Sequence, residues 1–422
     1  MKPSKSPWWW VPTLYFAEGL PYIAVMTLSV ILYKRMGLSN TDIALYTGWL
    51  YLPWVIKPIW SPLVDMFSSK RRWIVVMQLC IAIALAGVAL TLPMDSFFTL
   101  SLACFYLVAF FSATHDIAAD GFYILALDTH DQSLFVGIRS TFYRIATVAG
   151  QGGVVIAAGL MEEHLGSIPD AWSTVFMGMS LFFFLISFYH WWSLPEPEKA
   201  SPANEGRPPK ATVTEFFNIF RRFFTKPGIT TALLFMLLYR LPEAMLVKLI
   251  NPFLLDPASA GGMGLSTGQV GFTYGTIGII GLTLGGIIGG IVVSRGGLSH
   301  WLRPMAWSMS LTCLTFLYLS LCPESSLLTV NVCVFIEQFG YGFGFTAYML
   351  YLIYFVEGPD ATAHYSICTG FMALGMMLPG MAAGWIQEQL GYPMFFALTI
   401  ACCALTIGVA SMLKINPSFG KK

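Results

Sequence analysis

Charge is scarce in this chain of 422 residues. Asp, Glu, Lys and Arg make up 11% of it, whereas hydrophobic residues make up 56%. Soluble proteins carry roughly 25% charged residues, and a bilayer can cover apolar surface that a soluble core cannot. The net charge of +1 gives no sign of a nucleic-acid partner. The composition therefore predicts an all-α membrane protein in contact with the lipid bilayer.

Motifs for metal, nucleotide or covalent chemistry are missing as well. The eight cysteines show no metal or redox spacing, and neither H-E-x-x-H nor a P-loop occurs. The string Gly264-Leu-Ser-Thr-Gly268 matches a nucleophile elbow in its letters only, because such an elbow needs a preceding strand. We therefore expect no metal, no cofactor and no enzymatic activity.

What the chain has in abundance is long hydrophobic runs. A helix of about 20 apolar residues crosses a bilayer, and twelve runs come close to or exceed that length. The first run is too long for a cleaved signal peptide, so we expect it to be retained. The predicted spans are 9–33, 42–64, 73–93, 97–127, 133–161, 171–193, 228–255, 267–293, 304–321, 326–356, 362–388 and 391–413.

Lysine and arginine gather on one side of the predicted membrane. Of the 23 in the chain, five lie within spans and only Lys34 and Arg35 lie on the side opposite the N-terminus, which leaves 23 − 5 − 2 = 16 on the N-terminal side. Cytoplasmic loops carry this excess. The pattern predicts cytoplasmic termini in a multi-pass protein of the cell inner (plasma) membrane, which we expect to be a monomer.

A polar stretch separates the sixth span from the seventh, so the spans divide six and six. Its Phe-rich end alternates with Arg221 and Arg222 behind a capping box of Thr212 and Glu215, which predicts an amphipathic helix on the cytoplasmic surface. A cytoplasmic extension of span seven is the alternative. The predicted parts are an N-terminal bundle over 1–194, a linker over 195–227 and a C-terminal bundle over 228–422.

The loops after spans two and eight share a pattern, in which a small residue, three apolar residues and a polar residue precede basic charge. The pattern begins at Ser61 in the first loop and at Gly290 in the second. The arrangement resembles the major facilitator superfamily, whose signature in this loop is Gly-x-x-x-Asp followed by basic residues. The gating residues that the resemblance implies are Asp65, Lys70, Arg71 and Arg72.

Acidic side chains recur inside the predicted spans, where an ionisable group is expensive and marks function. They occupy spans one, four, seven and ten, which are the first helices of successive three-helix units. In the resembled superfamily these four helices line the central cavity. The acids are Glu18, Asp116, Asp120, Glu243 and Glu337.

Counting residues from each hairpin turn gives the depth of a side chain in the membrane, and several acidic side chains have the same predicted depth as basic ones. Asp116 and Asp120 are also four residues apart on one helix face, and two such close carboxylates favour retention of a proton by one of them. They are either proton carriers, together with Glu18 and Glu337, or members of a static ion-pair network. The level pairs are Glu18 with Lys57, Asp120 with Arg139, and Asp116 with Arg144.

The second half places Arg240, Glu243 and Glu337 near the middle of the membrane. Pro242 should break span seven at that level, and broken helices at this depth are typical of binding sites in transporters. Arg240 either contacts substrate or forms a salt bridge with Glu337. Lys248 is either a second anion contact or snorkels outward.

Close packing is predicted for span eight. Gly281, Gly285 and Gly289 recur every four residues there. Small residues at this spacing let two membrane helices approach each other closely.

Three strings resemble the muropeptide permease branch of the superfamily, which also includes the acetyl-coenzyme A transporters. Tyr15-Phe-Ala-Glu-Gly-Leu-Pro21 is similar to its Phe-x-x-Gly-Leu-Pro. Leu52-Pro-Trp-Val-Ile-Lys-Pro-Ile-Trp-Ser-Pro-Leu-Val-Asp65 is similar to its Leu-Pro-x-x-x-Lys-x-x-Trp-x-Pro-x-x-Asp. Ser112-Ala-Thr-His-Asp-Ile-Ala-Ala-Asp120 is similar to its Ser-Ala-Thr-Gln-Asp-Ile-x-x-Asp, with His in place of Gln.

This resemblance implies proton-driven import of anhydromuropeptides, which are anionic sugar–peptide fragments of the cell wall. A carrier of another anionic solute, such as a coenzyme A thioester, or of a drug-type substrate is the alternative, and a non-transporting membrane sensor is a remote one. Lysine and arginine side chains would bind the carboxylates of the ligand, and tyrosine side chains would contact its sugars. The expected substrate-binding residues are Lys57, Arg144, Arg240, Glu243, Lys248, Tyr15, Tyr22, Tyr239 and Tyr341.

Overall fold

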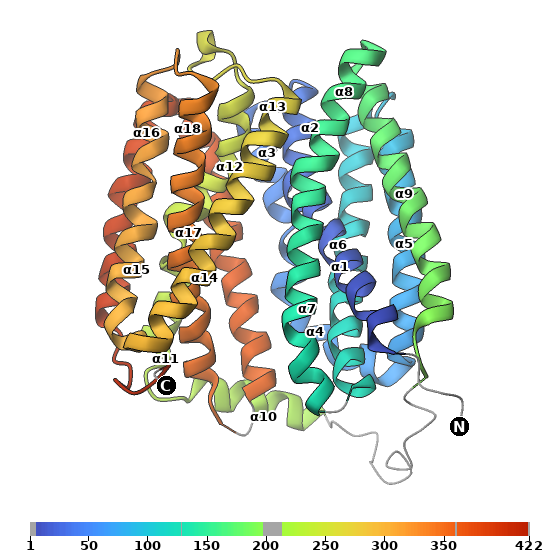
Figure 1. Ribbon diagram of the computed structural model, residues 1–422, viewed down its shortest axis with the longest axis vertical. Helices are drawn as coiled ribbons and strands as arrows, with labels where there is room; N and C mark the ends of the chain where they lie inside the picture. Colours follow the sequence, from blue (N-terminus) through green and yellow to red (C-terminus); the bar gives the residue numbers. More distant parts are fainter. Residues whose placement is uncertain (1–5, 128, 197–212, 359–360, 421–422) are drawn as a thin grey trace. The chain divides into compact units, whose positions relative to one another are not determined.

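Helices form all the regular secondary structure in the part of the chain that the structure describes (Figure 1). The computed structural model describes residues 6–127, 129–196, 213–358 and 361–420. Within these ranges, the side chains at 62–63, 65–67, 129–134, 136–137, 213–216 and 361–362 are not described. The predicted cap Thr212, linker residues 197–212 and the side chains of Glu215 and Asp65 therefore lie outside the description.

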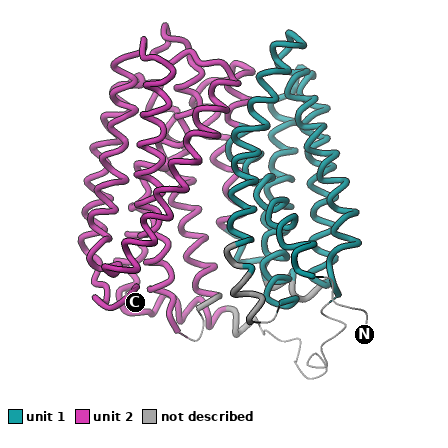
Figure 2. Tube along the Cα trace, viewed as in Figure 1, with its two compact units in different colours: residues 1–29, 56–214 teal, residues 30–55, 215–422 magenta. Residues whose placement is uncertain are grey.

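The chain forms two compact units (Figure 2). Unit 1 comprises Met1–Ser29 and Ile56–Thr214, and unit 2 comprises Val30–Val55 and Glu215–Lys422. Residues 30–55 precede most of unit 1 in the sequence, yet they group with unit 2. The main helices of unit 1 are α1 (Val11–Ile23), α4 (Leu52–Phe67), α5 (Lys70–Thr91), α6 (Phe97–Ala126), α7 (Thr129–Val148), α8 (Val155–Leu165) and α9 (Ile168–Ser193).

Unit 2 holds two short helices from early in the chain and all the helices of its second half. Three π-helical segments, Ala24–Leu28, Ala149–Val154 and Thr273–Gly278, interrupt the long helices of the molecule. The helices of unit 2 are α2 (Ser29–Arg35), α3 (Asn40–Trp49), α10 (Val213–Phe224), α11 (Ile229–Leu238), α12 (Leu241–Leu255), α13 (Thr267–Phe272), α14 (Ile279–Gly296), α15 (Leu298–Thr312), α16 (Leu314–Leu321), α17 (Leu327–Val356) and α18 (Ala361–Met412).

Serine side chains set where several helices begin. Ser39, Ser167 and Ser326 each accept a hydrogen bond from the backbone N–H three residues later. Ser266 forms a full capping box with Gln269 ahead of α13. Each cap satisfies a donor that the first helical turn would leave unpaired.

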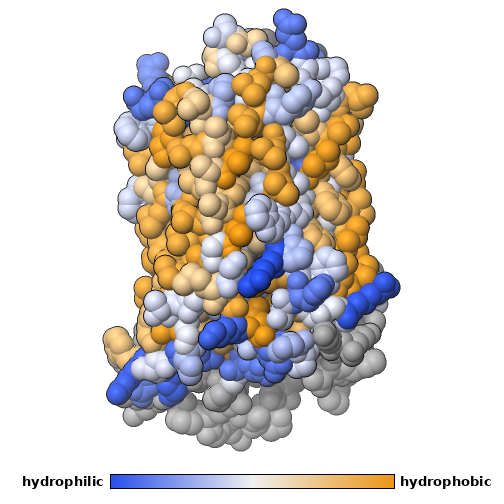
Figure 3. Space-filling model, turned by 90° about the vertical axis from the view of Figure 1, so that its left-hand side faces the viewer, coloured by the Kyte–Doolittle hydropathy of each residue, from blue (hydrophilic) through white to orange (hydrophobic). Residues whose placement is uncertain are grey.

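Nine helices in the described residues are long and apolar enough to cross a membrane. The last of them, Ala363–Met412, comprises two helices that meet at a kink at Gly391 (φ 72°), and they fall on the two runs predicted as spans eleven and twelve. Figure 3 shows hydrophobic side chains over much of the middle of one face and hydrophilic ones toward its lower end. The count of twelve spans and the side on which the termini lie stay predictions.

Two predicted spans are broken into shorter helices. In the second, α3 ends at Trp49 and α4 begins at Leu52; in the seventh, α11 ends at Leu238 and α12 begins at Leu241. Pro242 occupies the first turn of α12, where its missing N–H costs nothing. The predicted break in span seven is confirmed.

The Phe-rich segment forms α10, a helix separate from α11 that runs crosswise to it (Figure 1). Gly228 (φ 76°) lies between the two helices, so α10 does not extend span seven. Phe223 is buried against Phe355 and Phe371, whereas Arg221 is exposed. One face of α10 thus packs on unit 2 and the other carries charge.

The small-residue face of α14 packs against α17, as predicted. A Cβ at Gly281 would lie 2.6 Å from the carbonyl oxygen of Phe335, and one at Gly285 would overlap the carbonyl oxygen of Phe339. The absence of side chains is therefore what brings the two backbones together.

Candidate proton and substrate sites

Helices α1, α4, α6 and α7 bring five ionisable side chains of unit 1 together. Lys57 on α4 forms an ion pair with Asp116 on α6. Arg139 Nη2 on α7 lies 2.8 Å from Asp120 Oδ1 on α6, which confirms the second predicted pair. We call this group the unit 1 charge cluster; its members are Glu18, Lys57, Asp116, Asp120 and Arg139.

Glu18 on α1 is the member of the cluster without a cation. It is buried, and no hydrogen-bond donor in the described residues reaches its Oε2. Its carboxyl lies within hydrogen-bonding reach of the Asp116 carboxyl. The predicted Glu18–Lys57 pair is therefore wrong, because Lys57 is taken by Asp116 and residue counts give depth but not direction around the helix.

The predicted pairing of Asp116 with Arg144 is also wrong. Arg144 is exposed and has no ion-pair partner in the described part of the chain. It follows Arg139 by five residues, which at 3.6 residues per turn is a rotation of about 140° around α7. A helix that turns Arg139 toward α6 therefore turns Arg144 away from it.

Aromatic residues surround the Arg139 guanidinium. Its carbon lies 4.5 Å from the ring centre of Tyr15 and 5.1 Å from that of Tyr123. The Tyr15 hydroxyl lies 3.5 Å from Asp120 Oδ1. Close approach of α1 to α7 makes this possible, since a Cβ at Gly19 would lie 2.9 Å from that of Ala146.

In unit 2, Arg240 lies at the break between α11 and α12. Its Nη2 is 2.5 Å from the Tyr341 hydroxyl, and its guanidinium carbon is 4.7 Å from the Phe345 ring centre. Glu337 is buried and accepts a hydrogen bond of 2.7 Å from Gln338, but forms no ion pair with Arg240 in the described residues. The salt-bridge alternative for Arg240 is therefore not found.

Three of the other predicted substrate contacts are buried and one is half-buried. Glu243 and Tyr239 are buried, and the Tyr239 hydroxyl donates to the Gly344 carbonyl at 3.0 Å, which is a packing role. Tyr22 is half-buried. Lys248 is also buried, so it does not snorkel outward; its Nζ donates to Thr47.

The loop after α4 is only partly described. Lys70 is buried beside Gly121, where an added Cβ would meet Lys70 Cε at 2.8 Å. Arg71 forms an ion pair with Glu196 and bonds the Trp191 carbonyl, and Arg72 is exposed.

Sequence reasoning missed a buried chain of polar groups next to the cluster. His115 and His190, which look isolated in the sequence, both contact the Gln78 amide, at 2.9 Å and 2.8 Å. His190 continues to the Thr13 hydroxyl at 3.0 Å. The one available signal was a glutamine in the middle of an apolar run. In the described residues no group of three or more His, Cys, Asp or Glu is placed to hold a metal ion.

Comparison with known proteins gives one family. The model of the Major Facilitator Superfamily matches residues 13–363. The anhydromuropeptide permease of Escherichia coli strain K12 is 25% identical over 396 residues, covering 92% of this chain and 76% of the permease. A protein of Rickettsia conorii named as transporter AmpG 4 is 24% identical and covers 96% of each chain.

Solved structures agree in fold. A D-xylose–proton symporter superposes with a TM-score of 0.72 at 11% identity, covering 97% of this chain and 98% of the other. The nucleoside transporter NupG superposes with a TM-score of 0.71 at 14% identity, covering 96% and 98%.

Proposed function

Because this chain belongs to the Major Facilitator Superfamily, we propose that it is a secondary active transporter that takes up anhydromuropeptides together with protons. A relative that covers 92% of the chain is named a permease for that solute, which supports the choice. The proposal includes twelve spans, cytoplasmic termini and a monomeric working form. Its central element is the unit 1 charge cluster.

The charge balance of this cluster is the observation that carries the proposal. Three carboxyl groups face two fixed cations, so full ionisation leaves 2 − 3 = −1. An unbalanced charge inside a membrane protein is costly, and one bound proton removes it. Asp116 and Asp120 each form an ion pair, whereas Glu18 forms none in the described residues and adjoins a second carboxyl. Glu18 is therefore the proposed proton carrier.

In the proposed cycle, Glu18 takes a proton from outside the cell and substrate binds. The two bundles then rock about a central site, and both ligands leave on the cytoplasmic side. Asp116 and Asp120 hold Lys57 and Arg139 in place throughout. Glu337, which lies beside Gln338, is the corresponding proton site proposed for unit 2.

Cations outside the balanced cluster are proposed to bind the substrate's carboxylates. Arg144 is exposed on α7, and an arginine facing lipid is costly, so this face of α7 is proposed to border water and substrate. Arg240 presents a planar guanidinium flanked by Tyr341 and Phe345, a combination suited to carboxylates and sugar faces. Glu243, Tyr15 and Tyr22 complete the candidate set.

The test is uptake of labelled N-acetylglucosaminyl-anhydromuramyl tripeptide into proteoliposomes, with and without an inward proton gradient. Accumulation that requires the gradient is the expected result. Uptake that ignores the gradient would reject proton coupling. If this solute is not taken up, the same vesicles with a coenzyme A thioester or a drug-type compound test the alternative carriers, and binding without transport of any of them would indicate a sensor.

A further inference from the structure

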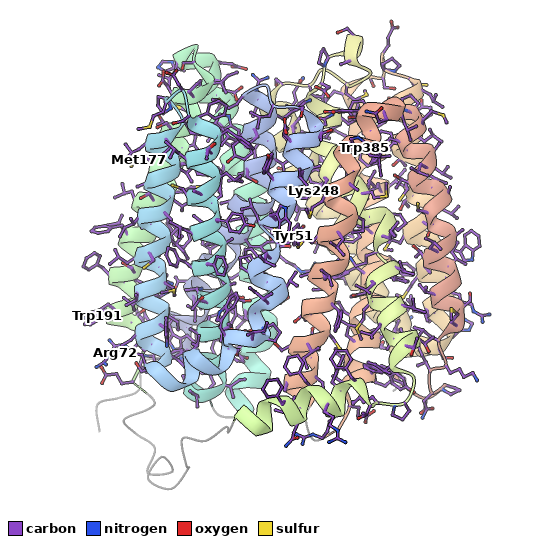
Figure 4. All side chains as sticks on the ribbon, turned by 180° about the vertical axis from the view of Figure 1, so that it is seen from behind. Tyr51, Arg72, Met177, Trp191, Lys248 and Trp385 are labelled. Carbon is purple, nitrogen blue, oxygen red and sulfur yellow. The ribbon has the colours of Figure 1, made fainter. Side chains whose placement is uncertain are left out.

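Lys248 is a buried cation on α12 that the proton cycle does not use. It is 2% exposed. Its Nζ lies 3.0 Å from Thr47 Oγ1 on α3 and 5.1 Å from the centre of the Tyr51 ring (Figure 4). In the described residues no carboxylate lies within ion-pair distance of Nζ.

Its partners satisfy Lys248 poorly. An ammonium group has three donors, and Thr47 Oγ1 is the one hydrogen-bond acceptor that it meets among the described residues. Thr47 in turn donates to the Ile43 carbonyl at 2.6 Å. A neutral hydroxyl and a ring face offset little of the cost of removing a charge from water. The site would be stabilised much more by an anion.

The packing shows that the lysine stem is accommodated rather than forced in. Gly380 on α18 leaves room for it, since a Cβ there would lie 3.2 Å from Lys248 Cγ. The position thus accommodates a long side chain, whose terminal nitrogen has Thr47 as its one hydrogen-bond partner among the described residues.

A second lysine in unit 2 does meet an acid, which makes a contrast with Lys248. Lys34 Nζ lies 2.7 Å from Asp256, the residue that follows α12. Tyr392 also donates to Asp256, at 2.6 Å. Asp256 is eight residues from Lys248, or about 12 Å along a helix. The same region of unit 2 therefore holds one lysine with a carboxylate and one without.

We propose that Lys248 and Thr47 form an anion-binding subsite, in which an acidic group of the substrate replaces the Thr47 hydroxyl as partner of Lys248 when α3 and α12 separate. A carboxylate or a phosphate group would fit. This inference rests on the proposed transport function and adds to it the chemical class that unit 2 selects.

The experiment compares two forms of one solute in proteoliposomes: the labelled anhydromuropeptide and the same molecule with its carboxylates converted to amides. Lys248→Met should raise KM for the acid at least about tenfold and change KM for the amide far less, while Lys248→Arg should retain most of the preference for the acid. Lys414→Met, which removes an exposed lysine near the chain end, is the matched control and should change neither. Equal effects of Lys248→Met on both forms would overturn the proposal.

A binding measurement separates this inference from the proposed solute. Thermal shift of wild type and Lys248→Gln is measured with the anhydromuropeptide, coenzyme A and acetyl-coenzyme A. Lys248→Gln keeps a donor for Thr47, so it tests the charge without emptying the contact. A shift that only wild type shows with a phosphate-bearing compound supports the subsite even if muropeptide uptake fails. Shifts that are the same in both proteins, or absent from both, would reject it.

Discussion

The charged groups of the two units differ in what they lack. In unit 1, each lysine and arginine of the charge cluster faces a carboxylate, and one carboxyl group is left over. In unit 2, Lys248 is left without a carboxylate, and Arg240 lies among aromatic rings. A carboxyl group without an ion-pair partner is stabilised by binding a proton, whereas an ammonium group without one is stabilised by binding an anion. The comparison therefore favours a proton site at Glu18 in unit 1 and an anion site at Lys248 in unit 2, beside the roles proposed for Arg144 in unit 1 and Glu337 in unit 2.

Glu18→Gln should have the largest effect on transport, because it removes the proposed proton site and leaves a balanced cluster. The accumulation ratio under an inward proton gradient should fall at least about tenfold, which corresponds to about 1.4 kcal/mol of lost driving force. Exchange of labelled for unlabelled solute should persist, since it needs no net proton movement. Gradient-driven accumulation at the wild-type level would show that Glu18 is not the proton carrier.

Lys57→Met tests the pairing within unit 1. It leaves Asp116 without its cation at a site where both side chains are about one-fifth exposed. The loss of unfolding free energy should be about 2–4 kcal/mol, since removing one partner of a largely buried pair strands the other charge. Thermal unfolding in detergent measures it. Lys57→Met with Asp116→Asn should recover much of the loss; a double variant no better than the single one would contradict the pairing.

Gly285→Ala tests whether disturbed helix packing in unit 2 changes substrate preference in the same way as loss of the anion site. The new methyl would overlap the Phe339 carbonyl oxygen and push α14 from α17. Overpacking of this kind costs about 1–3 kcal/mol. Gly290→Ala is the control, because nothing lies within 4 Å of its added Cβ. Melting temperature should fall for Gly285→Ala alone, without a change in the preference for acid over amide substrate.

Arg139→Gln should affect stability least. Arg139 and Asp120 are 30% and 43% exposed, and water in the proposed central site would screen such a pair. The expected cost is below about 1 kcal/mol, read in the same unfolding assay as Lys57→Met. A loss as large as that of Lys57→Met would show that both ion pairs are equally buried in solution and would weaken the distinction between them.

Much of the fold follows from local chemistry. The hydrophobic runs, the break at Pro242 and the close glycine face of α14 are each properties of a short segment, and the structure contains them. The kink at Gly391 falls where the predicted spans eleven and twelve meet, so it too is a local feature. The grouping of residues 30–55 with unit 2 depends on contacts between distant segments. No local pattern reports such contacts.

The candidate sites were found in part. Depth along a helix follows from counting residues, so Asp120 and Arg139 were matched correctly. Direction around the helix axis depends on how each helix is rotated against its neighbours. The predicted pairs Asp116–Arg144 and Glu18–Lys57 are therefore wrong, because Arg144 faces away from Asp116 and Lys57 pairs with Asp116 instead.

The order of the amino acids is enough to predict a membrane protein with acids and bases at particular depths, because the cost of charge in lipid acts on each residue separately. Which of those charges meet depends on how the helices pack. In the folded chain Lys57 pairs with Asp116, and Glu18 lies beside a second carboxyl. Gln78 links His115 to His190, and Lys248 is buried against Thr47. The reason is that a charge is balanced by whatever lies within a few ångströms of it, and helix rotation and packing set those neighbours.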